Sequence, residues 1–217
     1  IRNFRPDAVI HNYVLWWALS RTYRREGVPA AIEMHDLVTL NAALRKRLSD
    51  RWAATGGVPL EGDASLMPGF FDDPALRADP LEFACLGRFP VISCISRAEQ
   101  DQVDRNCRKS RSVLVPMTRE AASSMPSLEG PAILPIGPNP FNLQGLHVLA
   151  RSVLPLVRER APDFSIRVTG AIPEGAPRVA GLEYVGYVSD LRAEFARSSF
   201  LASPVFGGTG EQVKVLE

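Results

Sequence analysis

The residues with the clearest chemical meaning form a glycine-rich turn, 207–210, which follows a predicted strand ending at Pro204. Thr209 and Gln212 have the spacing of a capping box, which predicts that a helix begins at about residue 210. The unpaired N–H groups and the dipole of such a helix favour an anion, and glycines let a phosphate approach the backbone. Lys214 adds a positive charge one turn further on. The turn therefore predicts a phosphate site, the alternative being a tight turn without a ligand.

Two known nucleotide fingerprints do not fit this turn. A P-loop ends in Gly-Lys-Ser or Gly-Lys-Thr, and neither tripeptide occurs in the chain. A dinucleotide pattern G-x-G-x-x-G that began at Gly208 would have Val213 in place of its third glycine. A nicotinamide-dependent oxidoreductase is therefore the least favoured of the functions considered.

A second candidate group, His35-Asp36, ends an apolar stretch that reads as a strand. With an ordinary pKa of about 6.5, a histidine can orient or deprotonate a hydroxyl group at neutral pH. The alternative interpretation is structural, with the histidine satisfied at the strand end and Asp36 capping a helix that begins near Leu37. Glu33, two residues earlier, adds a further acid to this group.

Composition narrows the class of protein. The 217 residues are 46% hydrophobic and 23% charged with a formal net charge of +1, which excludes a disordered chain and a general nucleic-acid binder. The cysteines Cys85, Cys94 and Cys107 lack the short spacing of a zinc or redox motif, so we expect a reduced, cytoplasmic protein. We expect no metal and no cofactor. No apolar run reaches the roughly 20 residues needed to span a bilayer.

Short apolar stretches alternate with longer amphipathic ones along the chain, which predicts parallel sheets flanked by helices. The predicted strands are 7–12, 28–34, 90–95, 112–116, 132–136, 165–170, 182–187 and 200–204. The predicted helices are 13–26, one that begins near residue 37, 96–109, 141–160 and 190–198, and residues 55–80 read as a loop.

This pattern predicts an α/β protein with two Rossmann-like domains that face a cleft. We expect one Rossmann-like domain at 1–117, a linker at 118–130 and a second Rossmann-like domain at 131–217. Both domains are expected to be incomplete, because the chain begins without methionine and stops within a predicted helix. Ligands of open α/β sheets bind beyond the carboxyl ends of the strands, where both candidate groups lie.

Several segments in this order resemble the family 4 (group 1) glycosyltransferases, which have the GT-B fold. The segments that carry the resemblance are Arg5–His11, Glu33–Asp36, Ile95–Glu99, Ile133–Gly137, Gly181–Leu191, Ser203-Pro204 and Gly207–Glu217. Together they span most of the chain except residues 55–80.

The resemblance implies transfer of a sugar from a nucleotide-diphosphate donor, UDP by preference, to a hydroxyl group of a carbohydrate or lipid-linked acceptor, with retention. The family has two acidic residues separated by seven positions. The second, which binds the donor ribose, falls on Glu217, whereas the first falls on Thr209, a departure from the pattern. Thr209 and Gly210 would offer backbone N–H groups to the phosphates, and Lys214 would neutralise charge on the leaving diphosphate.

Further donor contacts are implied within the second domain. The loop that begins at Gly137 lacks the cation that the family often places there, and Asn142 offers a hydrogen bond instead. The alternative is that this loop is only a helix entry. Tyr187-Val188 matches the segment that flanks the base, although both side chains fit sheet packing equally well. With Gly208 of the turn, these residues complete the expected donor site.

On the acceptor side, the resemblance makes His35 and Asp36 the catalytic candidates, together with Lys214. Two other functions remain open. The missing first acid favours a nucleotide-sugar-binding protein without transfer activity. A GT-B-like sugar-nucleotide epimerase would instead need acids and histidine across the cleft, for which Glu33, His35 and Asp36 are the candidates.

A basic cluster, Arg45-Lys46-Arg47, lies on a predicted helix whose other face carries Leu40, Leu44, Leu48 and Trp52. A basic amphipathic helix beside an acceptor site suits peripheral contact with an anionic membrane, as expected in polysaccharide or glycolipid biosynthesis. The alternative is a solvated helix face with no ligand.

Overall fold

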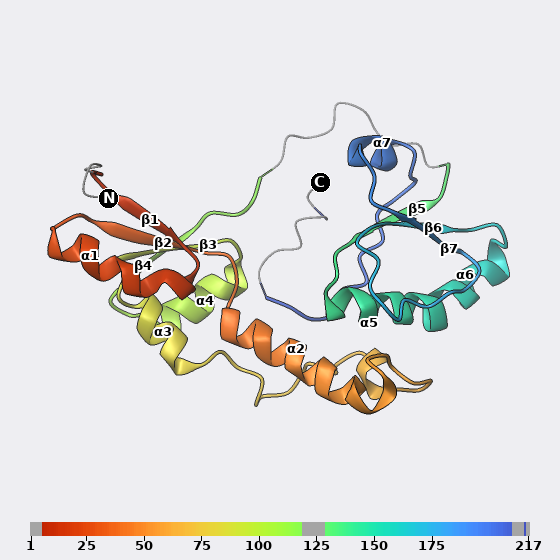
Figure 1. Ribbon diagram of the computed structural model, residues 1–217, viewed down its shortest axis with the longest axis horizontal. Coiled ribbons are helices and arrows are strands. Elements are labelled where there is room, and N and C mark those ends of the chain that lie inside the picture. The colour runs from red at the N-terminus through yellow and green to blue at the C-terminus, as the bar shows by residue number, and fades with distance from the viewer. Residues whose placement is uncertain (1–5, 119–128, 210–214, 216–217) are drawn as a thin grey trace. The chain divides into compact units, whose positions relative to one another are not determined.

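The computed structural model describes residues 6–118, 129–209 and 215, and it shows an α/β protein (Figure 1). The described residues form two compact units, each built around one parallel sheet. Unit 1 comprises residues 6–43, 74–118, 209 and 215, and unit 2 comprises residues 44–73 and 129–208. The predicted α/β class with parallel sheets is thus confirmed. The domain bounds expected from the sequence stay a prediction.

Unit 1 contains a sheet of four parallel strands in the order β1-β2-β3-β4. The strands are β1 (Val9–Asn12), β2 (Ala30–Met34), β3 (Val91–Cys94) and β4 (Arg111–Leu114). Since each strand pairs with the next one along the chain and parallel crossovers are right-handed, the connecting helices fall on one face of the sheet. These are α1 (Ser20–Arg25), α3 (Pro80–Leu86) and α4 (Arg97–Asn106), which lie together below the strands in Figure 1.

The core of unit 1 lies between the sheet and these helices. Ile32, Ile92 and Cys94 point to the helices and are 0% exposed, as is Val103 of α4. All three cysteines of the chain are free and buried, and burial raises the pKa of Cys94 to about 12. These thiols therefore pack as small apolar side chains and are poor nucleophiles.

Two helices of unit 1 differ from the prediction. The helix expected at 13–26 is divided into a 3₁₀ helix, Val14–Leu19, and α1. Helix α3 was not predicted, although Asp79 caps it by accepting from the N–H of Leu81, and Pro80 occupies its first turn. Both are ordinary helix-start signals, hidden here by the many Gly, Pro and Asp residues that precede them.

Unit 2 contains three parallel strands in the order β5-β6-β7. They are β5 (Ala132–Ile136), β6 (Ile166–Gly170) and β7 (Leu182–Gly186). Leu201 forms a parallel bridge to Ile133 beside β5, so the strand predicted at 200–204 is reduced to a single bridge. The return from β7 to the far side of β5 explains why α7 (Leu191–Ala196) lies on the face of this sheet opposite α5 and α6 (Figure 1).

The helix predicted at 141–160 is present in three parts. Helix α5 (Pro140–Val148) passes through a π-helical stretch, Leu149–Val153, into α6 (Leu154–Arg160). Pro155, which lacks an N–H group, lies just after the π-helical stretch and interrupts the regular hydrogen-bond ladder.

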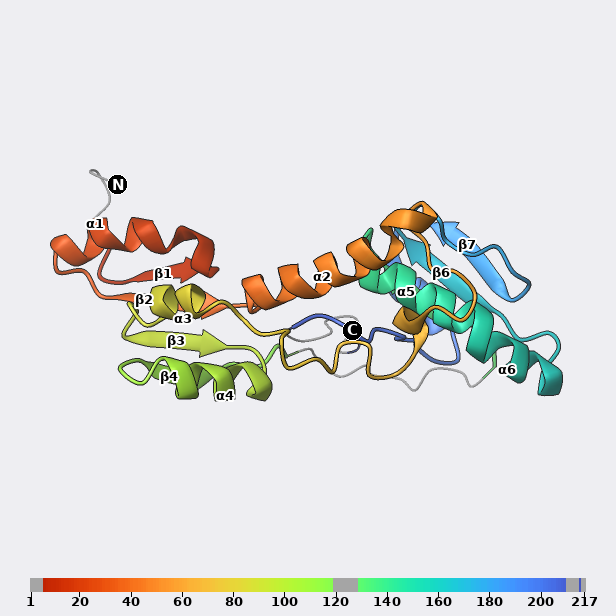
Figure 2. The same cartoon turned by 90° about the horizontal axis from the view of Figure 1, so that it is seen from below.

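Helix α2 (Val38–Trp52) is the longest helix of the described residues and begins in unit 1 before it continues into unit 2 (Figure 2). The predicted apolar face is confirmed, since Leu44, Leu48 and Trp52 are buried. The indole N–H of Trp52 donates to the hydroxyl of Ser65 at 2.9 Å, which ties α2 to the 3₁₀ turn Ala64–Leu66 within unit 2. Across the described parts of the chain, no helix combines the length and the apolar character that crossing a membrane requires.

Candidate functional site

The candidate site lies at the carboxyl edge of the sheet in unit 1, where β1 and β2 end side by side. Tyr13 follows β1, and its backbone N–H donates to the carbonyl oxygen of Glu33 in β2 at 3.1 Å. His35 and Asp36 follow β2 directly. The loops that leave a parallel sheet at this edge are where open α/β proteins bind ligands.

His35 lies between a carboxylate and an aromatic ring. Its Nε2 is 3.8 Å from Oε2 of Glu33, and the ring centroids of His35 and Tyr13 are 4.8 Å apart. The side chain of His35 is 30% exposed and that of Glu33 is 39% exposed, so a ligand can reach both. An imidazole nitrogen beside a carboxylate is a chemical arrangement that can accept a proton from a hydroxyl group.

Tyr13 has a backbone conformation that is unusual for a residue other than glycine. Its φ of 63° lies in the left-handed region and its ψ is 145°. Such conformations cost about 1–3 kcal/mol and persist where the surrounding structure holds them, commonly at functional sites. Sequence reasoning missed Tyr13, because nothing in its residue type or neighbours signals a positive φ.

Asp36 and Thr209 meet within unit 1, although they are far apart in the sequence. The hydroxyl of Thr209 donates to Oδ1 of Asp36 at 3.1 Å and accepts from the backbone N–H of Leu37, also at 3.1 Å. Thr209 thus binds the N-terminus of α2. The capping box predicted for Thr209 involves Gln212, which lies outside the described residues.

Glu82 of α3 binds the next two N–H groups of α2. Its carboxylate accepts from Val38 N–H at 2.7 Å and Thr39 N–H at 2.9 Å, and it also accepts from the Thr39 hydroxyl. Glu82 is only 4% exposed. Glu82 and Thr209 thus both bind the start of α2, although no local spacing in the sequence connects either residue to Leu37.

These contacts decide what the described part of the site can bind. Three N–H groups at the start of α2 already have protein acceptors, so this helix end is not an anion site. The remaining polar groups, Glu33, His35 and Asp36, are mainly hydrogen-bond acceptors. They suit the hydroxyl groups of a neutral ligand better than a phosphate. Within the described ranges, no three His, Cys, Asp or Glu side chains are grouped to hold a metal ion.

The donor residues predicted in unit 2 are held by contacts within that unit. Asn139 caps α5 by accepting from Phe141 N–H at 2.7 Å, and the amide of Asn142 donates to the carbonyl of Gly137 at 2.9 Å. Gln144 donates to the carbonyl of Ser65. The loop after β5 is therefore a helix entry, and a donor contact for Gly137 and Asn142 stays a prediction.

The other predicted donor residues have more open surroundings. Tyr187 is 84% exposed and Val188 half-buried at the carboxyl end of β7. Gly208 has a φ of 113°, and a Cβ at Gly207 would come within 2.7 Å of the Phe71 and Phe141 rings. The turn therefore needs glycine for packing in unit 2, whatever it binds. Gly210, Lys214 and Glu217 lie outside the described residues.

The basic cluster lies on a helix, α2, as predicted, but in a part of α2 that belongs to unit 2, whereas His35 and Asp36 belong to unit 1. Lys46 pairs with Asp50 and Arg47 with Asp73, each at 2.6 Å, whereas Arg45 is exposed. Two of the three cations are thus neutralised by neighbouring carboxylates, which reduces the charge available to an anionic surface.

No protein-family model and no curated protein sequence matches this chain.

Proposed function

We propose that the protein is a glycosyltransferase that transfers a sugar from a nucleotide-diphosphate donor, preferably a UDP-sugar, to a hydroxyl group, and that it is organised as a GT-B enzyme. The observation that carries the proposal is the grouping of His35, Glu33 and Asp36 at the carboxyl edge of the sheet in unit 1. A proton acceptor beside hydrogen-bond acceptors is what recognition and activation of a sugar hydroxyl require.

In the proposed reaction, the acceptor oxygen bonds to the anomeric carbon of the donor sugar while the bond from that carbon to the diphosphate breaks. The hydroxyl proton passes to Nε2 of His35. Glu33, at 3.8 Å, stabilises the imidazolium, and Tyr13 packs against the ring and limits its rotation. The nucleoside diphosphate leaves with the bonding electron pair.

Asp36 has a different part in this proposal. Its Oδ1 is bound by the Thr209 hydroxyl, and Thr209 also accepts from Leu37, so these contacts fix the backbone directly after His35. Asp36 and Thr209 would thus hold His35 in place. The donor contacts proposed for Gly137, Asn142, Tyr187, Val188, Gly208, Gly210, Lys214 and Glu217, and the retention of configuration, rest on the family resemblance.

Release of UDP tests the proposal directly. The chain is incubated with UDP-glucose or GDP-mannose and a panel of sugar and glycolipid acceptors, and free nucleotide diphosphate is measured. We expect release from one donor in the presence of one acceptor class. His35→Gln should slow it by about 100-fold or more, because general-base catalysis contributes about that factor, and Glu33→Gln by about 10-fold. Glu174→Gln, an exposed acid in unit 2, is the matched control and should leave the rate unchanged.

Calorimetric titration with UDP and GDP separates the alternatives. His35→Gln should bind UDP as tightly as the wild type, since His35 acts on the acceptor. Binding of UDP without release from any donor would favour a nucleotide-sugar-binding protein without transfer activity. The presence of Thr209 where the family has its first acidic residue also favours this alternative. The proposal is wrong if the protein neither binds UDP or GDP at millimolar concentration nor releases nucleotide diphosphate from any donor.

A further inference from the structure

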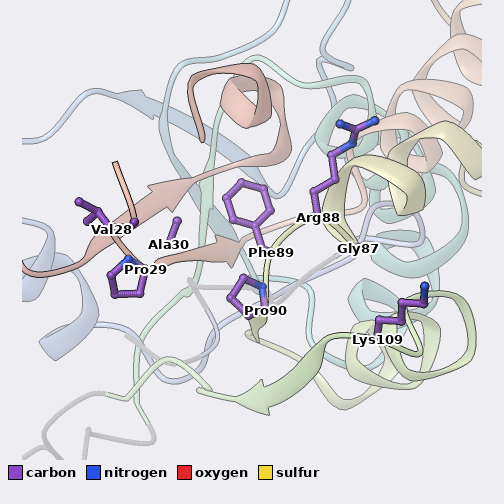
Figure 3. A pocket seen from close by; sticks show the side chains of 9 residues that line it. Val28, Pro29, Ala30, Gly87, Arg88, Phe89, Pro90 and Lys109 are labelled. Atoms are coloured by element: carbon purple, nitrogen blue, oxygen red, sulfur yellow. The ribbon is translucent and has the colours of Figure 1, made fainter. Parts of the chain in front are cut away.

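A hollow of about 350 Å³ lies at the opposite, amino edge of the sheet in unit 1 (Figure 3). It is lined by the turns that lead into β2 and β3 and by the turn before β4, and its lining includes Pro29, Ala30, Arg88, Phe89, Pro90 and Lys109. A volume of this order is at the lower end of what small-molecule sites enclose. None of these residues belongs to the site around His35.

The chain segments that contribute to the lining of this hollow are rich in cations. The three segments 25–30, 87–90 and 105–111 contain six cations and a single acid, Glu26, although the whole chain has a net charge of only +1. The cations are Arg25, Arg88, Arg105, Arg108, Lys109 and Arg111. Two of them, Arg88 and Lys109, line the hollow itself, and the backbone N–H of Arg111 donates to the carbonyl of Pro90 in its wall at 2.8 Å.

Lys109 and Arg111 differ from several arginines of unit 2. There, Arg51, Arg167 and Arg197 each have a carboxylate within 4 Å. Among the described residues, by contrast, no carboxylate forms an ion pair with Lys109 or Arg111. A local excess of positive charge at a concave surface raises the local concentration of anions.

The lining also has an apolar part. Phe89 is 1% exposed and Ala30 is 5% exposed, so they form the floor, while Pro29 and Pro90 are exposed at the rim. Arg88 is anchored above it, with its guanidinium 4.6 Å from the ring centroid of Trp17. A planar guanidinium fixed in this way can form paired hydrogen bonds to a phosphate, and a lysine adds a mobile positive charge.

We infer that this hollow binds a small organic phosphate, with the phosphate held by Arg88 and Lys109 and an apolar body against Pro29, Phe89 and Pro90. The site is separate from the proposed catalytic group and does not depend on the proposed function. Because both cations lie on turns that enter the sheet, a bound anion would join the loops before β3 and β4.

Titration with phenyl phosphate tests the inference, at constant ionic strength set by NaCl. Heat of binding and tryptophan fluorescence are measured together, since a ligand that moves Arg88 changes the surroundings of Trp17. We expect saturable binding. Arg88→Ala should weaken it by about 10-fold and Lys109→Ala by about 5-fold, as expected for the loss of one charge-assisted contact. Lys46→Ala, which removes another exposed lysine, one paired with Asp50, is the matched control and should leave binding unchanged.

Three further comparisons make the result decisive. Inorganic phosphate should bind more weakly than phenyl phosphate, and phenol should not bind, because the inference requires both a charged and an apolar contact. His35→Gln should bind phenyl phosphate like the wild type. The inference is wrong if binding does not saturate by tens of millimolar, if Lys46→Ala weakens it as much as Lys109→Ala, or if inorganic and phenyl phosphate bind equally.

Discussion

The two edges of the sheet in unit 1 use charge in opposite ways. At the carboxyl edge, acids predominate, and Glu82 and Asp36 are tied into the fold by hydrogen bonds with Val38, Thr39 and Thr209. At the amino edge, cations predominate, and Lys109 is exposed and without an ion pair among the described residues. The same four strands thus support an edge whose polar groups hold the structure together and an edge whose polar groups face solvent.

This difference indicates which edge contributes to the stability of the fold and which edge is free to bind a ligand. A buried carboxylate that satisfies backbone N–H groups cannot be removed without leaving those groups unpaired. An exposed lysine can be removed at almost no cost to folding. Substitutions at the carboxyl edge should therefore change stability and activity together, whereas those at the amino edge should change ligand binding alone.

The largest expected effect is that of Glu82→Ala. Removal of this buried carboxylate leaves the N–H groups of Val38 and Thr39 without their acceptor at a half-buried helix start, so the free energy of unfolding should fall by about 2–4 kcal/mol. Urea denaturation followed by circular dichroism measures the change. Glu82→Gln, which keeps one acceptor oxygen, should lose about half as much. A loss below about 0.5 kcal/mol for Glu82→Ala would show that the cap is not needed.

A smaller effect on stability should come from His11, which lies within strand β1. Its ring is 7% exposed and packs against Tyr23 and Phe89, with centroids 5.7 and 5.3 Å away, and burial lowers its pKa below 6.5. Because the unfolded chain binds this proton more readily, stability is fully present above about pH 6.5 and declines as the pH falls towards the folded-state pKa.

Denaturation at pH 7.5, 6.5 and 5.5 checks this dependence on His11. The difference in unfolding free energy between pH 7.5 and pH 5.5 should be smaller in His11→Leu than in the wild type. Burial also lowers the pKa of His147 in unit 2, so some dependence on pH remains in the variant. An unchanged pH dependence in His11→Leu would contradict the assignment.

The smallest effect is expected at the amino edge. Lys109→Ala should change the free energy of unfolding by no more than about 0.5 kcal/mol, because it removes an exposed side chain with no ion pair in the described structure. The same urea titration measures it beside Glu82→Ala. A loss above about 1 kcal/mol would mean that Lys109 supports the fold and would remove the contrast between the edges.

Some features of the site could be predicted from sequence and others could not. The helix predicted at 96–109 is present as α4, which Ser96 caps by accepting from the N–H of Glu99 at 3.3 Å. The position of His35 at the end of β2 was also predicted correctly. The strain at Tyr13 and the cap provided by Glu82 were not, because neither depends on neighbours in the sequence.

The sequence by itself determined the alternation of strands and helices, the parallel sheets and the apolar face of α2, because each follows from periodic burial over a few residues. Only the tertiary structure decided that Thr209 meets Asp36, that Glu82 binds the start of α2, and that Arg88 and Lys109 share one hollow. These contacts join residues tens of positions or more apart, and their geometry depends on how the strands are ordered in the sheet. The glycine-rich turn, prominent in the sequence, is described by the structure only as far as Thr209.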